Sequence, residues 1–131
     1  MKNAAILVVD DFQAVRKALG RALESVGYIV FLAASGEEAL AILREHHMDA
    51  IVMDLHMPVM SGQTLFHVII GKWPALKARV LIMTGDAKAE EKESWLKLYD
   101  LPVVKKPFAL GEVITLIDVL TEDEPREANG S

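Results

Sequence analysis

The sequence of 131 residues lacks cysteine and contains more acidic than basic side chains. Without cysteine it has no disulfide scaffold, no thiolate zinc site and no cysteine nucleophile, and it is consistent with a cytoplasmic location. The 14 basic and 19 acidic residues leave a net charge of −5, which disfavours a direct interface with nucleic acid. No apolar run is long enough to span a bilayer, so we expect no membrane association.

Short apolar runs alternate with segments of helical periodicity through most of the chain. The runs at 6–9 and 80–83 are continuously apolar, which is typical of strands covered on both faces. The alternation predicts the α/β class, with a doubly wound parallel sheet of five strands and helices on both faces. We expect one domain over residues 1–120 and a disordered acidic tail over residues 121–131. Strands are predicted at 6–9, 28–32, 50–55, 79–84 and 102–105, and helices at 12–26, after the capping box that begins at Ser35, and at 62–72, 87–98 and 110–120.

Polar side chains follow four of the five predicted strands, at the point where each strand ends. Each of them alone could be an ordinary turn, helix-capping or surface residue. Because the carboxyl ends of parallel strands meet at one edge of an open sheet, and ligands bind at that edge, their shared placement indicates one functional site. These residues are Asp10 and Asp11 after the first strand, Asp54 at the end of the third, Thr84 at the end of the fourth and Lys106 after the fifth.

The three carboxylates predict a bound divalent cation. Converging Asp10, Asp11 and Asp54 side chains would repel one another and raise the pKa of at least one of them. A set of oxygen ligands without sulfur or imidazole favours Mg²⁺. With the Lys106 amine and the Thr84 hydroxyl, such a cleft could hold a phosphoryl group, and a central carboxylate could accept it as an acyl phosphate. A nucleotide is not expected, because the sequence has no glycine-rich phosphate cradle.

Four short motifs lie at these strand ends. They are Val8-Val9-Asp10-Asp11, the stretch Asp-x-x-Met-Pro-x-Met-x-Gly from Asp54 to Gly62, Met83-Thr84-Gly85-Asp86 and Lys105-Lys106-Pro107-Phe108. With these motifs in this order, the chain resembles the receiver domain of bacterial two-component response regulators over about residues 4–120. The resemblance implies a CheY-like, flavodoxin-like (βα)5 fold with strand order 2-1-3-4-5. It also implies a regulatory phosphoacceptor that catalyses only its own phosphorylation and autodephosphorylation.

By position, the resemblance implies a role for each residue of the site. Asp54 would be the phosphoacceptor. Asp11, Asp54 and the backbone carbonyl of His56 would ligate Mg²⁺, and Asp10 would assist through the waters of the metal. Thr84 would donate a hydrogen bond to the phosphoryl group.

The last motif and the flanking positions carry further expectations from the resemblance. Lys106 would pair with the phosphoryl group, and the Lys106–Pro107 peptide bond would be cis, which is uncommon for a peptide bond. Val103 stands where receivers often carry an aromatic switch residue, so a coupled rotation of a threonine and an aromatic ring is in doubt. His56 and Asp86 occupy positions that tune the lifetime of the phosphoryl group in this family.

The resemblance implies two kinds of partner. A histidine kinase or phosphotransfer protein would supply the phosphoryl group from phosphohistidine, and the new charge would draw Thr84 inward and shift an existing equilibrium between two packings. The face formed by the fourth helix, the fifth strand and the fifth helix would then bind a downstream target or an output domain, or pair two copies into a homodimer. The predicted helix at 87–98 suits this movement because it has few apolar anchors, mainly Trp95 and Leu98.

Three other functions remain open from the sequence. A pseudo-receiver would bind partners without being phosphorylated. A phosphatase of the haloacid-dehalogenase type would require Asp-x-Asp after the first strand, where the sequence reads Asp10-Asp11-Phe12-Gln13. A flavodoxin-like carrier would place the FMN phosphate where two carboxylates repel it. The sequence names neither the kinase nor the target, and is compatible with a stand-alone receiver or with a part of a longer regulator or hybrid kinase.

Overall fold

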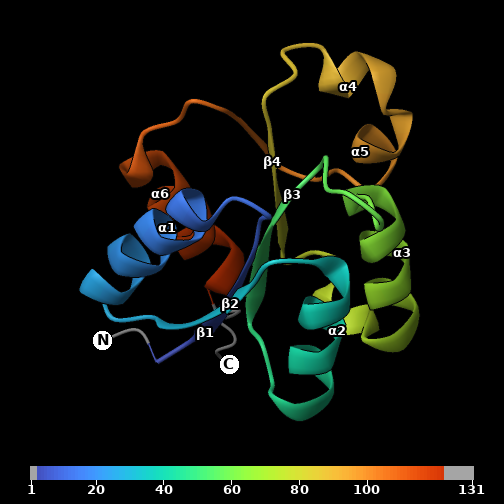
Figure 1. The fold of residues 1–131 in the computed structure, drawn as a ribbon. Helices are drawn as coiled ribbons and strands as arrows, with labels where there is room; N and C mark the ends of the chain where they lie inside the picture. Colours follow the sequence, from blue (N-terminus) through green and yellow to red (C-terminus); the bar gives the residue numbers. More distant parts are fainter. Residues whose placement is uncertain (1–2, 123–131) are drawn as a thin grey trace.

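The structure, a computed structural model, describes residues 3–122 and shows a five-stranded parallel sheet between two layers of helices (Figure 1). The strands are β1 (Ala5–Val9), β2 (Ile29–Ala33), β3 (Ala50–Asp54), β4 (Val80–Thr84) and β5 (Val103–Lys105). The helices are α1 (Gln13–Ser25), α2 (Gly36–Glu45), α3 (Gly62–Lys72), the 3-10 turn η1 (Pro74–Leu76), α4 (Ala89–Lys92), α5 (Ser94–Leu98) and α6 (Leu110–Thr121). The strand order β2-β1-β3-β4-β5 confirms the predicted topology. Most of the predicted tail, residues 123–131, lies outside the described part of the chain.

The inner strands are apolar throughout because helices cover both faces of the sheet. Successive side chains of a strand point to opposite faces. Along β1, Leu7 and Val9 belong to the core that packs against α2 and α3, whereas Ile6 and Val8 belong to the core that packs against α1 and α6. Figure 1 shows these two pairs of helices on opposite sides of the sheet. Within residues 3–122, no helix is long and apolar enough to cross a membrane.

Local sequence signals define where the helices begin and end. Gly27 follows α1 with φ of 105°, a left-handed conformation that favours glycine. Before α2, the Ser35 hydroxyl accepts a hydrogen bond from the backbone N–H of Glu38 at 3.1 Å, and the Glu38 carboxylate accepts one from the backbone N–H of Ala34 at 2.7 Å. This reciprocal pairing is a close variant of the predicted capping box.

The segment at 87–98 forms two short helices, α4 and α5, so the prediction of a single helix is wrong. Glu93 interrupts it with φ of −112° and ψ of 81°. The Glu93 carboxylate accepts a hydrogen bond from the indole N–H of Trp95 at 3.0 Å, a partner that a buried indole requires. Trp95 and Leu96 are the buried anchors, whereas Leu98 is 78% exposed and does not anchor the segment as predicted.

Candidate functional site

The structure brings the predicted site residues to the carboxyl edge of the sheet. Asp54 is the last residue of β3 and Thr84 the last residue of β4, and the strand register pairs Asp54 with Met83. Lys106 follows β5, and its backbone N–H donates a hydrogen bond to the carbonyl of Thr84 at 2.7 Å. Asp10 directly follows β1. Parallel strands that end at one edge therefore place residues from the whole length of the chain together.

An ion pair between Lys106 and Asp10 links the ends of the first and last strands. The Nζ of Lys106 lies 2.9 Å from Oδ2 of Asp10 and 3.5 Å from Oδ2 of Asp54. One carboxylate oxygen from each of Asp10, Asp11 and Asp54 lies within 4.8 Å of the other two. Three negative charges and one positive charge leave the cluster at −2, which one divalent cation would neutralise.

Burial perturbs the ionisation of this cluster. Asp10 is fully buried and Asp54 is 5% exposed. Burial raises the pKa of Asp54; the Lys106 ammonium opposes this effect, and the charges of Asp10 and Asp11 add to it. Burial alone would lower the pKa of Lys106, but its hydrogen bond to Asp10 and the charge of Asp54 raise it. The Asp54 anion is therefore destabilised by its surroundings. A second cation beside Lys106, or neutralisation of the Asp54 carboxylate, would relieve the repulsion.

The donor set of the cluster fits Mg²⁺. Oδ1 of Asp11 is buried and has no hydrogen-bond partner among the described residues, which is costly for a charged oxygen unless a ligand covers it. Asp10, in contrast, has both oxygens engaged, Oδ2 by Lys106 and Oδ1 by the backbone N–H of Phe12 at 2.9 Å. Three carboxylates without sulfur or imidazole match the preference of a small, hard cation. The orphaned oxygen of Asp11 thus points to direct ligation by this residue.

Thr84 is oriented by the loop that follows β4. Its side chain is fully buried, and its Oγ1 accepts a hydrogen bond from the backbone N–H of Asp86 at 3.0 Å. Within the described part of the chain, no acceptor is recorded for the hydroxyl proton. The hydroxyl therefore keeps a donor available for a group bound at the site.

The start of α3 approaches the end of β3 so closely that only glycine fits at the first position of the helix. A Cβ atom on Gly62 would lie 2.6 Å from the backbone oxygen of Asp54 and 2.9 Å from Cα of Leu55. The backbone N–H of Gly62 donates to the Leu55 carbonyl at 2.9 Å, and the N–H of His56 donates to Oδ1 of Asp54 at 3.4 Å. The loop between β3 and α3 therefore fixes the backbone beside the Asp54 carboxylate.

The motifs and this geometry agree with comparisons to known proteins. The family described as "Response regulator receiver domain" matches residues 6–118. The chain belongs to this family. "Response regulator MprA" of Mycobacterium tuberculosis is 35% identical over 127 residues, which cover 96% of this chain and 54% of that protein. "Sensor kinase CckA" of Brucella abortus is 37% identical over 127 residues, which cover 93% of this chain and 13% of that protein. This receiver domain spans about half the length of the first of these relatives.

A solved structure supports the fold of this receiver domain. Response regulator protein TrrA from Thermotoga maritima, in complex with Mg²⁺-BeF, superposes with a TM-score of 0.77 at 29% identity, covering 92% of this chain and 99% of that one. The cis peptide bond that the resemblance implied is present at Lys106–Pro107. Val103 of β5 pairs with Ile82 of β4 and is half-buried. The position where receivers often carry an aromatic ring is therefore occupied by a valine.

Two residues of the receiver site were not identified from the sequence. Arg16 donates a hydrogen bond from Nη1 to the backbone carbonyl of Asp10 at 2.6 Å. Phe12, the first residue of the helix predicted at 12–26, is 63% exposed, and its ring centroid lies 5.8 Å from Nζ of Lys106. The only sequence signal for either was its nearness to the acidic pair. The contacts of Arg16 and Phe12 depend on the conformation of the loop after β1, and hydrophobic periodicity does not predict loop conformation.

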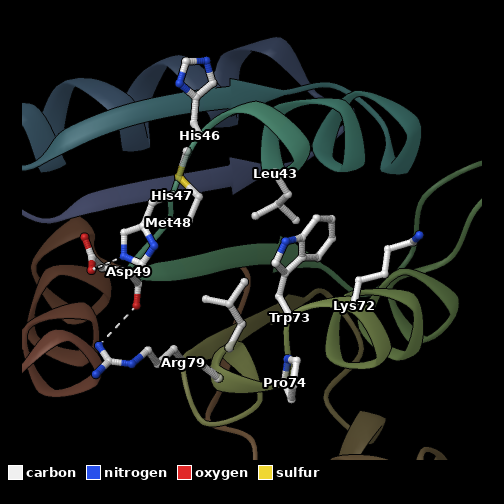
Figure 2. Close-up of a pocket in the computed structure, with 11 residues that line it drawn as sticks. Leu43, His46, His47, Met48, Asp49, Lys72, Trp73, Pro74 and Arg79 are labelled. Carbon is white, nitrogen blue, oxygen red and sulfur yellow. Dashed lines mark hydrogen bonds and ion pairs between the residues drawn. The ribbon is translucent and has the colours of Figure 1, made fainter.

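The receiver has cavities both beside the site and far from it. A groove of about 380 Å³ flanks Lys106, between α1 and the loop that precedes α6, and Val15, Ala18 and Phe108 are among its lining residues. A cavity of about 490 Å³ lies at the opposite, amino-terminal edge of the sheet, where Trp73 packs near Leu43 (Figure 2). None of the predicted site residues lines this second cavity. The predicted site residues therefore lie at the carboxyl edge, away from this second cavity.

Proposed function

We propose that Asp54 accepts a phosphoryl group from the phosphohistidine of a histidine kinase or phosphotransfer protein. A carboxylate oxygen of Asp54 attacks phosphorus, the donor's P–N bond breaks, and the imidazole nitrogen leaves with the electron pair. The observation that carries this proposal is the Lys106 amine, 2.9 Å from Asp10 and 3.5 Å from Asp54 within a cluster of three carboxylates. Such a site compensates charge at one reactive oxygen, which is most of what phosphoryl transfer requires.

Each side chain of the cluster has a distinct task in this proposal. Asp54 is the acceptor because both oxygens of Asp10 are already engaged, whereas from residues 3–122 Asp54 receives only a long hydrogen bond at 3.4 Å and a contact at 3.5 Å. Lys106 compensates charge on the transferred phosphoryl oxygens, and the free hydroxyl proton of Thr84 hydrogen-bonds one of them. Asp11, Asp54 and the backbone carbonyl of His56 would hold Mg²⁺, and Asp10 would assist through the waters of the metal. The cation would supply the remaining positive charge.

The proposed output surface is the face formed by α4, α5, β5 and α6. It corresponds to the face of the fourth predicted helix, the fifth strand and the fifth predicted helix. The Lys105 amine on β5 lies 3.1 Å from the Glu90 carboxylate on α4, and both side chains are partly exposed. Exposed ion pairs are weak, so this contact adds little resistance to a shift of α4. We propose that phosphorylation shifts this face between two arrangements, in which it binds a target protein, an output domain or a second copy. The proposed location is the cytoplasm.

The groove beside Lys106 is the proposed docking surface for the protein that donates the phosphoryl group. It is apolar apart from Lys106, whose amine lies 3.5 Å from the Asp54 carboxylate. Ala18 lines it and is exposed, so Ala18→Glu places a charge in the groove without disturbing the core. We expect this variant to lose at least tenfold in phosphotransfer rate from a phosphorylated kinase domain and to keep its rate with acetyl phosphate. Equal losses with both donors would contradict the docking role.

Phosphorylation by a small donor tests the central proposal. The chain is incubated with Mg²⁺ and acetyl phosphate and its intact mass is measured, with Asp54→Asn as the test variant. Asp100→Asn is the matched control, because Asp100 is exposed and has φ of 55°, a conformation that asparagine tolerates. One added phosphoryl group in the wild type and control, but none in Asp54→Asn, is expected. No added mass in the wild type would favour a pseudo-receiver, and multiple turnover of a phosphate ester would favour a phosphatase.

A further inference from the structure

The carboxylate of Asp86 is tied to α4 at both oxygens. Its Oδ1 accepts a hydrogen bond from the backbone N–H of Lys88 at 2.9 Å, and its Oδ2 lies 3.0 Å from Nζ of Lys92. The backbone N–H of the same residue holds the hydroxyl of Thr84 at 3.0 Å. Asp86 is therefore a direct link between the buried Thr84 hydroxyl of the site and α4 of the proposed output face.

Asp86 also lies near the mouth of the site. Its backbone N–H lies 3.0 Å from the buried Thr84 hydroxyl of the site. The Lys88 N–H and the Lys92 amine lower the pKa of Asp86. The backbone N–H of His56 donates to the Asp54 carboxylate at 3.4 Å. The Asp86 carboxylate is 28% exposed and belongs to the residue that holds the Thr84 hydroxyl, so it stands at the rim of the site.

We propose that Lys92 is a positioning residue that prolongs the life of the phosphoryl group on Asp54 by holding the Asp86 carboxylate against α4. This inference rests on the proposed phosphorylation of Asp54. During hydrolysis a water oxygen attacks phosphorus and the bond from phosphorus to the Asp54 oxygen breaks, leaving the free carboxylate, inorganic phosphate and one proton. A carboxylate at the rim that is free to turn can accept a hydrogen bond from this water and orient it. Lys92 keeps that carboxylate occupied.

The size of the effect is bounded by the exposure of the ion pair. The Lys92 side chain is 61% exposed and the Asp86 side chain 28% exposed. Pairs of this kind bias an equilibrium by a factor of at most about five. We therefore expect Lys92→Met to shorten the half-life of phosphorylated protein by about two- to fivefold. Lys92→Arg, which keeps the charge, should restore the half-life of the wild type.

The experiment follows the loss of the phosphoryl group after acetyl phosphate has been removed, by intact mass at fixed pH and Mg²⁺. The matched control is Lys97→Met, because Lys97 lies exposed on α5 and has no ion pair with any residue between 3 and 122. Its half-life should equal that of the wild type. Asp86→Asn should be at least as long-lived as the wild type, and adding Lys92→Met to it should change nothing further, because Lys92 acts through Asp86.

Two failures can be told apart. If the wild type gains no mass from acetyl phosphate, the proposed phosphorylation and the role of Lys92 are both overturned. If all variants load one phosphoryl group but Lys92→Met decays at the rate of the wild type, only the role of Lys92 is overturned. The same holds if Lys92→Met still accelerates decay in the Asp86→Asn background. Equal loading of each variant also shows that the site has folded.

Discussion

Replacing the Asp54 carboxylate by a neutral amide should stabilise the fold in the absence of divalent cations. Asp54→Asn keeps the shape of the side chain and removes one of three clustered negative charges. At an effective dielectric constant of about 20, two carboxylate oxygens no more than 4.8 Å apart repel by at least about 3.5 kcal/mol, and the contact of 3.5 Å between Lys106 and Asp54 attracts by about 4.7 kcal/mol. Two such repulsions exceed the one attraction by about 2 kcal/mol, and the cost of burying the charge has the same sign.

The predicted gain is therefore about 1–3 kcal/mol in the free energy of unfolding, measured by urea denaturation in EDTA at pH 7. The exposed Asp100→Asn change is the control and should stay within about 0.5 kcal/mol of the wild type. Addition of Mg²⁺ should stabilise the wild type more than Asp54→Asn, since a ligand stabilises the folded state that binds it more tightly. An Asp54→Asn protein equal to or less stable than the wild type in EDTA would refute the account of a strained carboxylate cluster.

The stability gained by Asp54→Asn should depend on pH. Burial raises the pKa of Asp54 above its value of 3.8 in the unfolded chain, so the folded state holds the proton more tightly. The Asp54 contribution to stability is then fully present below the unfolded pKa and is lost as the pH rises through the folded one. The advantage of Asp54→Asn in EDTA should accordingly be small at pH 3.5, grow as the pH rises above about 4, and level off once Asp54 is fully ionised. A gap that shrinks with rising pH would contradict the assigned direction.

Two further substitutions test the packing that supports the site. Gly62→Ala should lower the free energy of unfolding by at least about 2 kcal/mol and slow phosphorylation, because its Cβ would meet the Asp54 backbone oxygen at 2.6 Å. The control is Gly71→Ala in the same helix, whose Cβ meets nothing within 4 Å and which should stabilise the fold by up to about 1 kcal/mol. Equal urea midpoints for the two variants would contradict the clash. Leu96→Ala should lower the free energy of unfolding by about 2–4 kcal/mol, since the Leu96 side chain is 1% exposed. Leu98→Ala should change it little, because Leu98 is 78% exposed. Thermal or urea unfolding that ranks the two variants the other way would refute the assignment of the α5 anchor.

Most of the fold could be predicted because its strands are covered on both faces. A run such as Ile6 to Val9 is apolar at every position only if helices pack on both sides, and this requirement leads to a parallel sheet with alternating helices. The break at Glu93 could not be predicted in the same way. It depends on a hydrogen bond between its carboxylate and the Trp95 indole, and on the burial of Leu96 rather than Leu98, which are properties of tertiary packing.

The site was predictable to the extent that it follows from strand ends. Asp10, Asp54, Thr84 and Lys106 each end or follow a strand, so the parallel topology alone brings them to one edge. Contacts that loops create were not accessible from the pattern. The bond from Arg16 to the Asp10 carbonyl requires knowledge of how the chain turns after β1.

The ion pair between Asp10 and Lys106 joins side chains 96 positions apart in the chain. During synthesis on the ribosome, the acidic cluster is complete long before its lysine has emerged. A chain that stops short of β5 therefore holds three crowded carboxylates without the internal cation that balances them.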